Sequence, residues 1–382
     1  MQKILFISDY SFKVPGGAQK SMEIIMNGLS DQYEFYVLMP GKKYEYDEKY
    51  KIIFLEEFDN LLVNQNLRKT IHIIKKLSFV INQLRPAIIH AHMLSGMSAL
   101  LVLKLLTNIN CITIYTERGV VEKYSSINKI ILKKALEVFN KFITTTNYSK
   151  NLYESIFTVE KRKLLTIPNT AGPIFDNYIE EMYEKCREKY NLKNRTVMFS
   201  ARYTYDKNWE LTKQIIEYIS GKGNFEFIIV VGSDKSQEDI RKCEILIQEI
   251  EGITGKNNIR TFIDLSLNDV NELYYASDIF ILTSRTESFG RTAVEAMARK
   301  NIVFGTDVDG LSEVIGFEEY RYNSFEDFKE KFSLIDKVDI NKEKERFYKR
   351  YKENFSTKIN IEMHKHLYNE LLKEKDLGGR RK

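Results

Sequence analysis

The chain of 382 residues is poor in the residues that mark several protein classes. It contains three cysteines, five prolines and 18 glycines. Three widely separated cysteines provide neither a disulfide framework nor a zinc-binding spacing, so a reducing compartment, the cytoplasm, is expected. The low proline and glycine contents exclude collagen-like and low-complexity chains. With 43% hydrophobic and 12% aromatic residues, the chain has ample material for packed cores, which excludes disorder.

Long hydrophobic runs are also missing. The longest apolar stretch, residues 99–103, ends at Lys104, far below the roughly 20 residues that cross a bilayer. The short apolar run at residues 4–7 is stopped by Asp9, which does not fit a signal peptide. The sequence therefore predicts no transmembrane segment.

The net charge of +5 is unevenly distributed along the chain. Residues 1–175 carry 23 basic and 15 acidic side chains, whereas the remaining residues carry 35 and 38. This asymmetry indicates that the two parts meet different partners, although solvated lysine-rich helices would give the same counts. No nucleic-acid recognition motif accompanies the basic residues, so binding to nucleic acid is not expected.

Short apolar runs alternate with amphipathic helical patterns along the chain. The runs are nearly continuous, as in strands that are covered on both faces, and this predicts parallel, doubly wound sheets. A break at residues 168–180 separates two such series, which predicts two domains. The expected strands are residues 3–8, 34–38, 51–55, 87–91, 111–115, 141–145 and 163–167 in the first series, and 196–201, 225–231, 258–262, 278–282 and 301–305 in the second.

Polar motifs follow several strands of the first series, at the sheet edge where ligands bind in such folds. Gly16 and Gly17 precede a helix, whose amides favour an anion, although a plain tight turn has the same sequence. His92 closes the fourth strand within reach of a substrate, whereas His90 on the same face fits a core histidine. Arg118 and its acidic neighbour close the fifth strand, either facing a ligand or forming a surface ion pair.

Charged residues also follow strands of the second series. Arg202 ends the first of these strands and Lys207 lies at the start of the next helix, an arrangement that suits a pyrophosphate. An exposed arginine and lysine would leave the same pattern. Glu287 lies in the loop after a buried strand and Glu295 on the first turns of the following helix, so both carboxylates can accept hydroxyl hydrogen bonds from a sugar or a ribose. The helix dipole alone would also favour Glu287 at this position.

Taken together, these motifs resemble the retaining GT-B glycosyltransferases of family 4, the glycosyl transferases group 1. Glu287 and Glu295, with Ser288-Phe289-Gly290 between them, are similar to the family signature. Further motifs fall in the family order over nearly the whole chain: Gly16-Gly17, His90-x-His92, Thr116-Glu117-Arg118, Asn147-Tyr148-Ser149-Lys150, Ile167-Pro168-Asn169, Arg202 with Lys207-Asn208, and Gly305-x4-Gly310-Leu311-Ser312-Glu313.

The resemblance implies an α/β fold of the GT-B type. Two Rossmann-like, doubly wound domains then face each other across a cleft, and the C-terminal helix crosses back to the N-terminal domain. The implied parts are an acceptor-binding domain at residues 1–172, a nucleotide-sugar-binding domain at residues 173–354, and a crossover helix and tail at residues 355–382.

The resemblance also implies roles for individual residues. Arg202 and Lys207 match the pair that neutralises the donor diphosphate, Glu287 the ligand of the donor sugar, and Glu295 the ligand of the ribose. No cofactor and no metal are expected, because these cations replace a divalent ion. The residues implied in catalysis are Arg202, Lys207, Glu287, His92 and Arg118, and those implied in substrate binding are Gly16, Gly17, Ser288, Phe289, Gly290, Arg291 and Glu295.

The function implied is a retaining, metal-independent transfer of a hexose-type sugar from a nucleotide diphosphate donor, with UDP favoured. The acceptor is expected to be a saccharide or a polyprenyl-linked saccharide, in the synthesis of bacterial surface polysaccharide or glycolipid. The alternatives are a non-catalytic nucleotide-sugar-binding subunit and a sugar-nucleotide epimerase on the same fold.

Two residues depart from the family pattern. Arg118 stands where many members have histidine, and Asp309 stands where glycine is common. Asp309 also completes a DxD sequence with Asp307, a pattern that holds a metal with the nucleotide in another class of transferases. The order of motifs along the chain disfavours that interpretation.

Two predicted helices of the first half, residues 65–84 and 127–139, are amphipathic and basic. In the first, the side opposite the basic residues is expected to carry Leu67, Ile71, Ile74, Ser78 and Ile81. This pattern predicts peripheral attachment to an anionic membrane surface, at the inner face of the plasma membrane, with ordinary solubility as the alternative. The basic residues are Arg68, Lys69, His72, Lys75 and Lys76 in the first helix, and Lys129, Lys133 and Lys134 in the second.

Overall fold

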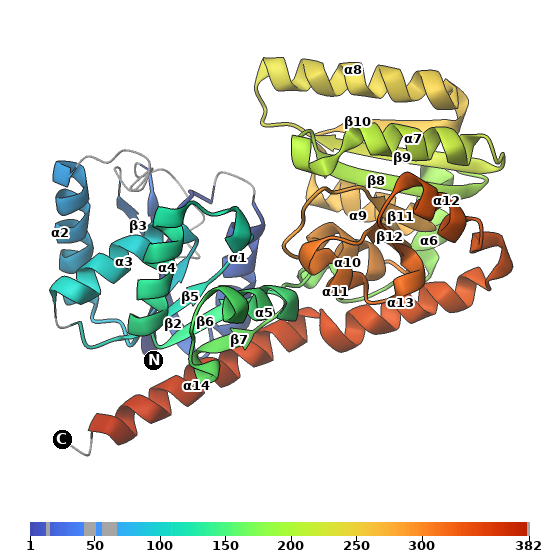
Figure 1. The fold of residues 1–382 in the computed structure, drawn as a ribbon. Helices are drawn as coiled ribbons and strands as arrows, with labels where there is room; N and C mark the ends of the chain where they lie inside the picture. Colours follow the sequence, from blue (N-terminus) through green and yellow to red (C-terminus); the bar gives the residue numbers. More distant parts are fainter. Residues whose placement is uncertain (13–15, 42–50, 56–66, 108, 380–382) are drawn as a thin grey trace. The chain divides into compact units, whose positions relative to one another are not determined.

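The structure, a computed structural model, describes residues 1–12, 16–41, 51–55, 67–107 and 109–379, without the side chains of residues 67–70, 378 and 379. It divides into two compact units (Figure 1). Unit 1 comprises Met1–Asn169 and Lys358–Lys382, and unit 2 comprises Thr170–Thr357. Among the described helices, none is both long enough and apolar enough to cross a membrane.

Unit 1 is built on a parallel sheet of seven strands in the order β3-β2-β1-β4-β5-β6-β7. Its strands are β1 (Gln2–Ser8), β2 (Tyr33–Pro40), β3 (Lys51–Leu55), β4 (Ile88–His92), β5 (Ile112–Thr116), β6 (Lys141–Thr144) and β7 (Leu164–Thr166). Its helices are α1 (Gly17–Leu29), α2 (Leu67–Leu84), α3 (Leu94–Leu106), α4 (Ser126–Val138), α5 (Asn147–Ile156) and α14 (Thr357–Gly379).

Different helices cover the two faces of this sheet. One face packs against α2, α3, α4 and α5 through residues such as Leu77 and Leu100. The other face packs against α1 and against α14, whose Leu367, Tyr368 and Leu371 join the core around Phe6 (Figure 1). The last helix of the chain therefore completes the core of unit 1, as parallel strands require cover on both faces.

Unit 2 has a parallel sheet of six strands in the order β10-β9-β8-β11-β12-β13. Its strands are β8 (Arg195–Arg202), β9 (Phe225–Gly232), β10 (Ile259–Ile263), β11 (Ile279–Leu282), β12 (Ile302–Thr306) and β13 (Arg321–Tyr322). Its helices are α6 (Glu181–Lys189), α7 (Trp209–Ser220), α8 (Gln237–Thr254), α9 (Leu267–Ala276), α10 (Arg291–Met297), α11 (Asp309–Ile315), α12 (Phe325–Phe332) and α13 (Ile340–Asn354).

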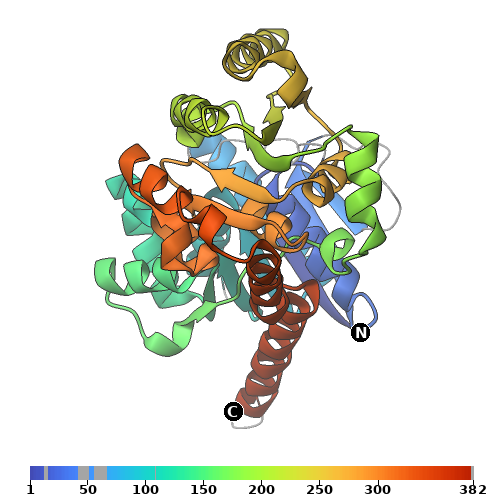
Figure 2. The same ribbon diagram turned by 90° about the vertical axis from the view of Figure 1, so that its right-hand side faces the viewer.

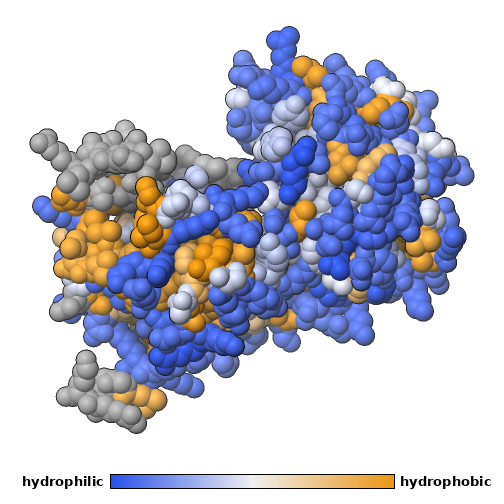
Figure 3. All heavy atoms as spheres, viewed as in Figure 1, coloured by the Kyte–Doolittle hydropathy of each residue, from blue (hydrophilic) through white to orange (hydrophobic). Residues whose placement is uncertain are grey.

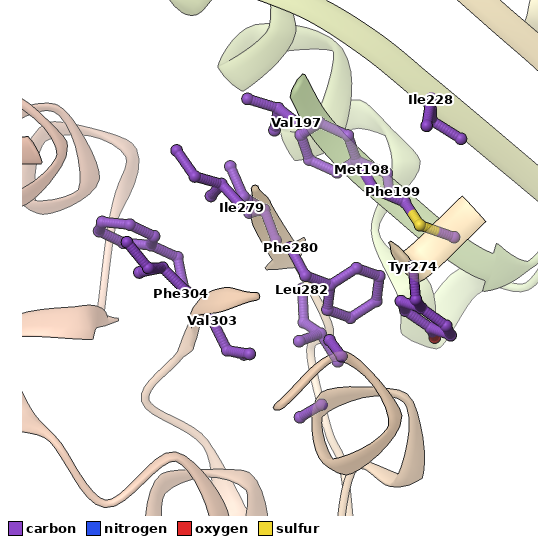
Figure 4. Packing of buried hydrophobic residues seen from close by; sticks show 14 of the residues in the cluster. Val197, Met198, Phe199, Ile228, Tyr274, Ile279, Phe280, Leu282, Val303 and Phe304 are labelled. Carbon is purple, nitrogen blue, oxygen red and sulfur yellow. The ribbon is translucent and has the colours of Figure 1, made fainter. Parts of the chain in front are cut away.

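The core of unit 2 is a single cluster around the central strands. Figure 4 shows Val197 and Met198 of β8 beside Phe280 of β11, with Tyr274 of α9 next to them. The rings of Tyr274 and Phe280 meet edge to face at 5.3 Å. Figure 2 shows α7 and α8 together on one side of this sheet, and the two helices pack against each other.

The predicted alternation of strands and helices in two parallel sheets is confirmed, with the strand limits shifted by a residue or two. The prediction for the faces of α2 was partly wrong. The buried apolar side chains among its described residues are Ile73, Leu77, Ile81 and Leu84, whereas Ile71 is 44% exposed. The apolar residues of α2 fill more than one helical stripe, so periodicity alone did not identify the buried one.

Candidate functional site

In both sheets the strand order reverses direction once, between β1 and β4 in unit 1 and between β8 and β11 in unit 2. Parallel sheets of this kind bind ligands at the carboxyl ends of the strands next to such a reversal. Candidate residues of both units lie at these positions, since His92 ends β4 and Arg202 ends β8, whereas Arg118 follows β5, one strand further along the sheet.

In unit 2 the loops after β8 and β11 are joined by hydrogen bonds. The hydroxyl of Thr283 donates to the carbonyl oxygen of Lys207 at 2.8 Å, and the amide of Arg285 donates to the carbonyl oxygen of Asp206 at 2.8 Å. The Arg285 guanidinium also donates to Asn208 Oδ1 at 2.7 Å. These bonds fix the loop that carries Lys207 against the loop that carries Glu287.

Lys207 and Glu287, 80 residues apart in the sequence, form an ion pair between these loops. Their side chains are 22% and 18% exposed, so water reaches the pair from one side. The sequence predicted both residues as ligands of the donor, and the structure brings them into contact with each other. Arg202 is exposed at the end of β8, where its carbonyl oxygen accepts a hydrogen bond from the Trp209 indole at 3.1 Å.

Helix α10 begins directly after this loop. Its N-cap residue, Gly290, has a φ of +85°, in the left-handed region, and a Cβ there would lie 2.6 Å from Leu311 Cδ1. Both facts require glycine at this position. Ser288 and Arg291 on either side are partly exposed, and Phe289 is buried against the ring of Phe355.

Glu295 lies in α10 and is buried, 7% exposed. Its Oε2 accepts a hydrogen bond at 3.2 Å from the hydroxyl of Tyr274. Burial and this carboxylate raise the pKa of Tyr274 well above its usual value, so the hydroxyl stays protonated and donates. No motif or spacing in the sequence points to Tyr274 as a neighbour of Glu295.

Both carboxylates of the DxD sequence are engaged by neighbouring residues. Asp307 is bound in an ion pair with Arg321 at 3.1 Å, and Asp309 accepts hydrogen bonds from Thr286 and Glu287. Within the described part of the chain, no group of three or more His, Cys, Asp or Glu side chains is arranged to hold a metal ion.

In unit 1, Asp9 follows β1 and holds the start of α3. Its two carboxylate oxygens accept hydrogen bonds from the amides of Ser95 and Gly96 at 2.8 and 2.7 Å. Burial raises the pKa of Asp9 to about 6, against the opposing effect of these amides. The residue therefore organises the turn between β4 and α3, next to His92.

The two histidines of β4 are fully buried and stack on each other with ring centroids 4.2 Å apart. His90 lies between the hydroxyls of Tyr368 of α14, at 2.9 Å, and Thr116 of β5, at 2.7 Å, as a core histidine does. His92 Nδ1 lies 3.1 Å from the guanidinium of Arg118. Because arginine can only donate, Nδ1 of His92 is the acceptor and its proton is on Nε2. Burial lowers the pKa of both histidines well below the usual value, so both are neutral at pH 7.

Arg118 and Glu117 do not form a surface ion pair with each other. Arg118 donates to Asn169 Oδ1 at 2.6 Å and to the hydroxyl of Ser21 at 3.3 Å. Glu117 is buried, and its carboxylate accepts hydrogen bonds from two backbone amides and two tyrosine hydroxyls. The structure thus gathers His92, Asn169 and Ser21 around the guanidinium of Arg118.

Gly16 and Gly17 lie at the start of α1, and both are exposed. Gly16 has an extended backbone, with a φ of −164°, which any residue adopts. A Cβ on Gly16 would lie 2.4 Å from the Gln19 side chain, so the glycine leaves room for that side chain. Ser21, one turn further along α1, is the residue of this helix that reaches Arg118.

Comparison with protein families agrees with this geometry. A family model described as Glycosyltransferase Family 4 matches residues 15–171, and a model described as Glycosyl transferases group 1 matches residues 183–357. The two matches fall on the two sheets and together cover most of the chain. The chain belongs to the family 4 glycosyltransferases.

Among known sequences, the chain is similar to a probable sucrose-phosphate synthase of Thermosipho melanesiensis, with 28% identity over 62% of this chain and 56% of the synthase. It is also similar to a capsular polysaccharide biosynthesis glycosyltransferase of Staphylococcus aureus, with 27% identity over 53% of this chain and 52% of that protein. These matches span about half the length of both relatives.

Among solved structures, a glycosyltransferase from Rickettsia africae shares the fold with a TM-score of 0.78 and 21% identity, over 97% of this chain and 99% of that one. An Anabaena protein solved in complex with UDP-glucose has a TM-score of 0.72 and 17% identity, over 97% of this chain and all of that one. At these identities the likeness concerns the fold, which is GT-B.

Proposed function

We propose that the protein is a retaining, metal-independent glycosyltransferase that moves a hexose-type sugar from a nucleotide diphosphate donor, with UDP favoured. The observation that carries this proposal is the Lys207–Glu287 ion pair at the β8–β11 reversal, between the end of one strand and the start of α10. It offers one cation and one carboxylate on the side that water reaches. A sugar diphosphate needs both: a cation for its phosphates and an acceptor for its hydroxyls.

The chemistry follows from the charges that develop when the donor breaks. Cleavage of the bond between the anomeric carbon and the diphosphate leaves negative charge on the phosphate and positive charge on the sugar. Lys207 and Arg202, with the N-terminus of α10, stabilise the leaving diphosphate. The acceptor hydroxyl attacks the same face of the sugar and passes its proton to the departing phosphate, so the configuration is retained and no nucleophile of the protein is required.

In this proposal Glu287 exchanges Lys207 for hydroxyls of the donor sugar, while Lys207 turns to the diphosphate. Glu295 is then the acceptor for the ribose hydroxyls. His92 and Arg118 belong to unit 1, where the acceptor is expected to bind. The protein cations take the role of a divalent metal, so the reaction requires none. The Anabaena structure with UDP-glucose supports a donor of this class on a fold of this type.

The test is a screen of UDP-, GDP-, dTDP- and CMP-sugars by thermal shift and by donor hydrolysis, with and without EDTA. One nucleotide class should raise the melting temperature and be hydrolysed, and EDTA should change neither. Lys207→Met should reduce the rate of donor hydrolysis at least tenfold and should reduce the rise in melting temperature. Lys213→Met is a matched control, because Lys213 is 21% exposed and paired with Glu210 and Glu249.

Other outcomes of the same screen would contradict the proposal. Conversion of the donor into a different sugar nucleotide would show an epimerase, and stabilisation by a donor without any turnover would show a binding subunit. Loss of activity on EDTA treatment, restored by manganese, would show that a metal is needed.

We further propose that the acceptor is a saccharide or a polyprenyl-linked saccharide, and that unit 1 attaches to an anionic membrane from the cytoplasmic side. Exposed apolar side chains gather on neighbouring helices of unit 1: Phe79 of α2 is 66% exposed, Leu106 of α3 70% and Ile130 of α4 68%. Figure 3 shows apolar surface over this part of unit 1. Lys75 of α2 and Lys133 of α4 are exposed on the same helices, which suits anionic lipid. Arg68 and Lys69, which the sequence included in this basic surface, have side chains outside the described part.

Co-sedimentation with liposomes tests this attachment. Binding should require anionic lipid, and Phe79→Ser combined with Ile130→Ser should reduce it several-fold. Ile245→Ser is the control, because Ile245 is 50% exposed on α8 of unit 2. Equal binding to neutral and anionic liposomes, or an equal loss in the control, would contradict the proposal.

A further inference from the structure

Asp309 occupies an unusual backbone conformation in the loop after β12. It is the first residue of α11, and its φ of +43° lies in the left-handed region that favours glycine. A residue with a Cβ pays of order 1 kcal/mol or more for this conformation. The side chain of Asp309 is therefore expected to make contacts that compensate for the strain.

The contacts of Asp309 lead directly to the loop of Glu287. Its Oδ2 accepts a hydrogen bond from the hydroxyl of Thr286 at 2.5 Å and another from the backbone amide of Glu287 at 3.0 Å. The amide of the next residue, Gly310, donates to the carbonyl oxygen of Glu287 at 3.1 Å. The backbone of Glu287 is thus held on both its amide and its carbonyl side by two adjacent residues of the β12 loop.

We infer that Asp309 is a positioning residue that sets the orientation of Glu287 toward the donor sugar. Three loops meet here: Asp309 holds the backbone of Glu287, and the carboxylate of Glu287 holds Lys207. When the donor takes the place of Lys207, the Asp309 contact remains and keeps the carboxylate in place. This inference rests on the proposed function, because it assigns Asp309 to the sugar-binding end of the same site.

Substitutions at Asp309 separate positioning from general stability. Asp309→Gly relieves the backbone strain and removes both side-chain hydrogen bonds, whereas Asp309→Asn keeps an oxygen that can accept them. Asp307→Asn is the matched control, because Asp307 lies two residues away in the same loop and is paired with Arg321. The binding of UDP and of UDP-glucose is measured by calorimetry for each variant, with the donor found in the screen used in place of UDP-glucose if it differs.

Asp309→Gly should bind the nucleotide sugar about tenfold more weakly, as expected for the loss of one to two hydrogen bonds, while its affinity for UDP stays within about twofold. Asp309→Asn and Asp307→Asn should both stay within about threefold of the wild type for both ligands. Equal weakening of UDP and the nucleotide sugar, or no weakening of either, would overturn the inference.

Hydrogen exchange of the ligand-free protein provides a second measurement that needs no donor. The amide of Glu287 should exchange at least tenfold faster in Asp309→Gly than in the wild type, and at the wild-type rate in Asp307→Asn. Unchanged exchange would overturn the inference whatever the donor is. If exchange changes as expected but the wild type binds no nucleotide sugar, the proposed function fails and the contact between the loops stands.

Discussion

Replacing His364 by leucine should make unit 1 less sensitive to acid. His364 lies on α14, 3% exposed, with its Nδ1 2.9 Å from the carbonyl oxygen of Asn360. Burial lowers its pKa to about 4, whereas an unfolded histidine titrates near 6.5. Between these values the unfolded chain binds a proton that the folded protein does not. The contribution of His364 to the stability of unit 1 is therefore fully present above pH 6.5 and is lost as the pH falls toward 4. This loss amounts to about 2 kcal/mol between pH 7 and pH 5.

The comparison with the variant isolates this contribution. Asp9 acts in the opposite direction, because its pKa is raised to about 6 and its folded form binds the extra proton over much of the same range. His90 and His92, whose pKa values are also lowered by burial, act in the same direction as His364. The pH dependence of the wild-type stability therefore combines opposing contributions, and those of Asp9, His90 and His92 cancel in the difference between wild type and His364→Leu. His366→Gln is the control, since His366 is on the same helix with a side chain 83% exposed.

The assay is urea unfolding at pH 7 and pH 5, followed by far-UV circular dichroism. The single tryptophan, Trp209, is in unit 2, so its fluorescence reports the unfolding of that unit. A transition that circular dichroism shows and the fluorescence does not is then the unfolding of unit 1. The wild type and His366→Gln should lose about 2 kcal/mol more than His364→Leu on going from pH 7 to pH 5. Equal losses in all three proteins would show that His364 does not contribute to the acid sensitivity of unit 1.

Two further substitutions test the loops of the site. Glu117→Ala should lower the stability of unit 1 by about 3 kcal/mol, because it removes the acceptor of several buried donors. Tyr153→Phe removes one of those donors and should cost about 1 kcal/mol; equal costs by urea unfolding would argue against this network. Gly290→Ala should reduce donor hydrolysis at least tenfold, since its Cβ would lie 2.6 Å from Leu311 at a φ of +85°. Gly223→Ala has a comparable φ of +68° with no atom within 4 Å, and an equal loss of activity there would assign the effect to backbone strain alone.

The fold could be predicted from the sequence because its strands are buried on both faces and so stand out as apolar runs. The chemical character of the strand ends was predictable for a related reason, since polar residues directly after such runs fall on one edge of the sheet. Both features are local in the sequence. The polar residues that follow the apolar runs include Arg202, Lys207 and Glu287.

The contacts between those residues were not predictable, because they depend on how distant segments align. Lys207 and Glu287 were predicted as separate ligands and form one ion pair. From the sequence, Glu117 was considered only together with its neighbour Arg118, whereas its partners include Tyr153, 36 residues further along the chain. Arg118 meets Asn169, 51 residues away. No periodicity or spacing in one sequence specifies such pairs.

The stereochemistry of donor cleavage is the most direct test of retaining transfer. The donor selected by the screen is incubated with the protein, and the anomeric proton of the released or transferred sugar is followed by NMR before mutarotation equilibrates the anomers. With an α-linked donor, we expect the sugar to appear first as the α anomer together with the nucleoside diphosphate. First appearance of the β anomer, or release of a sugar phosphate with the nucleoside monophosphate, would contradict retaining transfer.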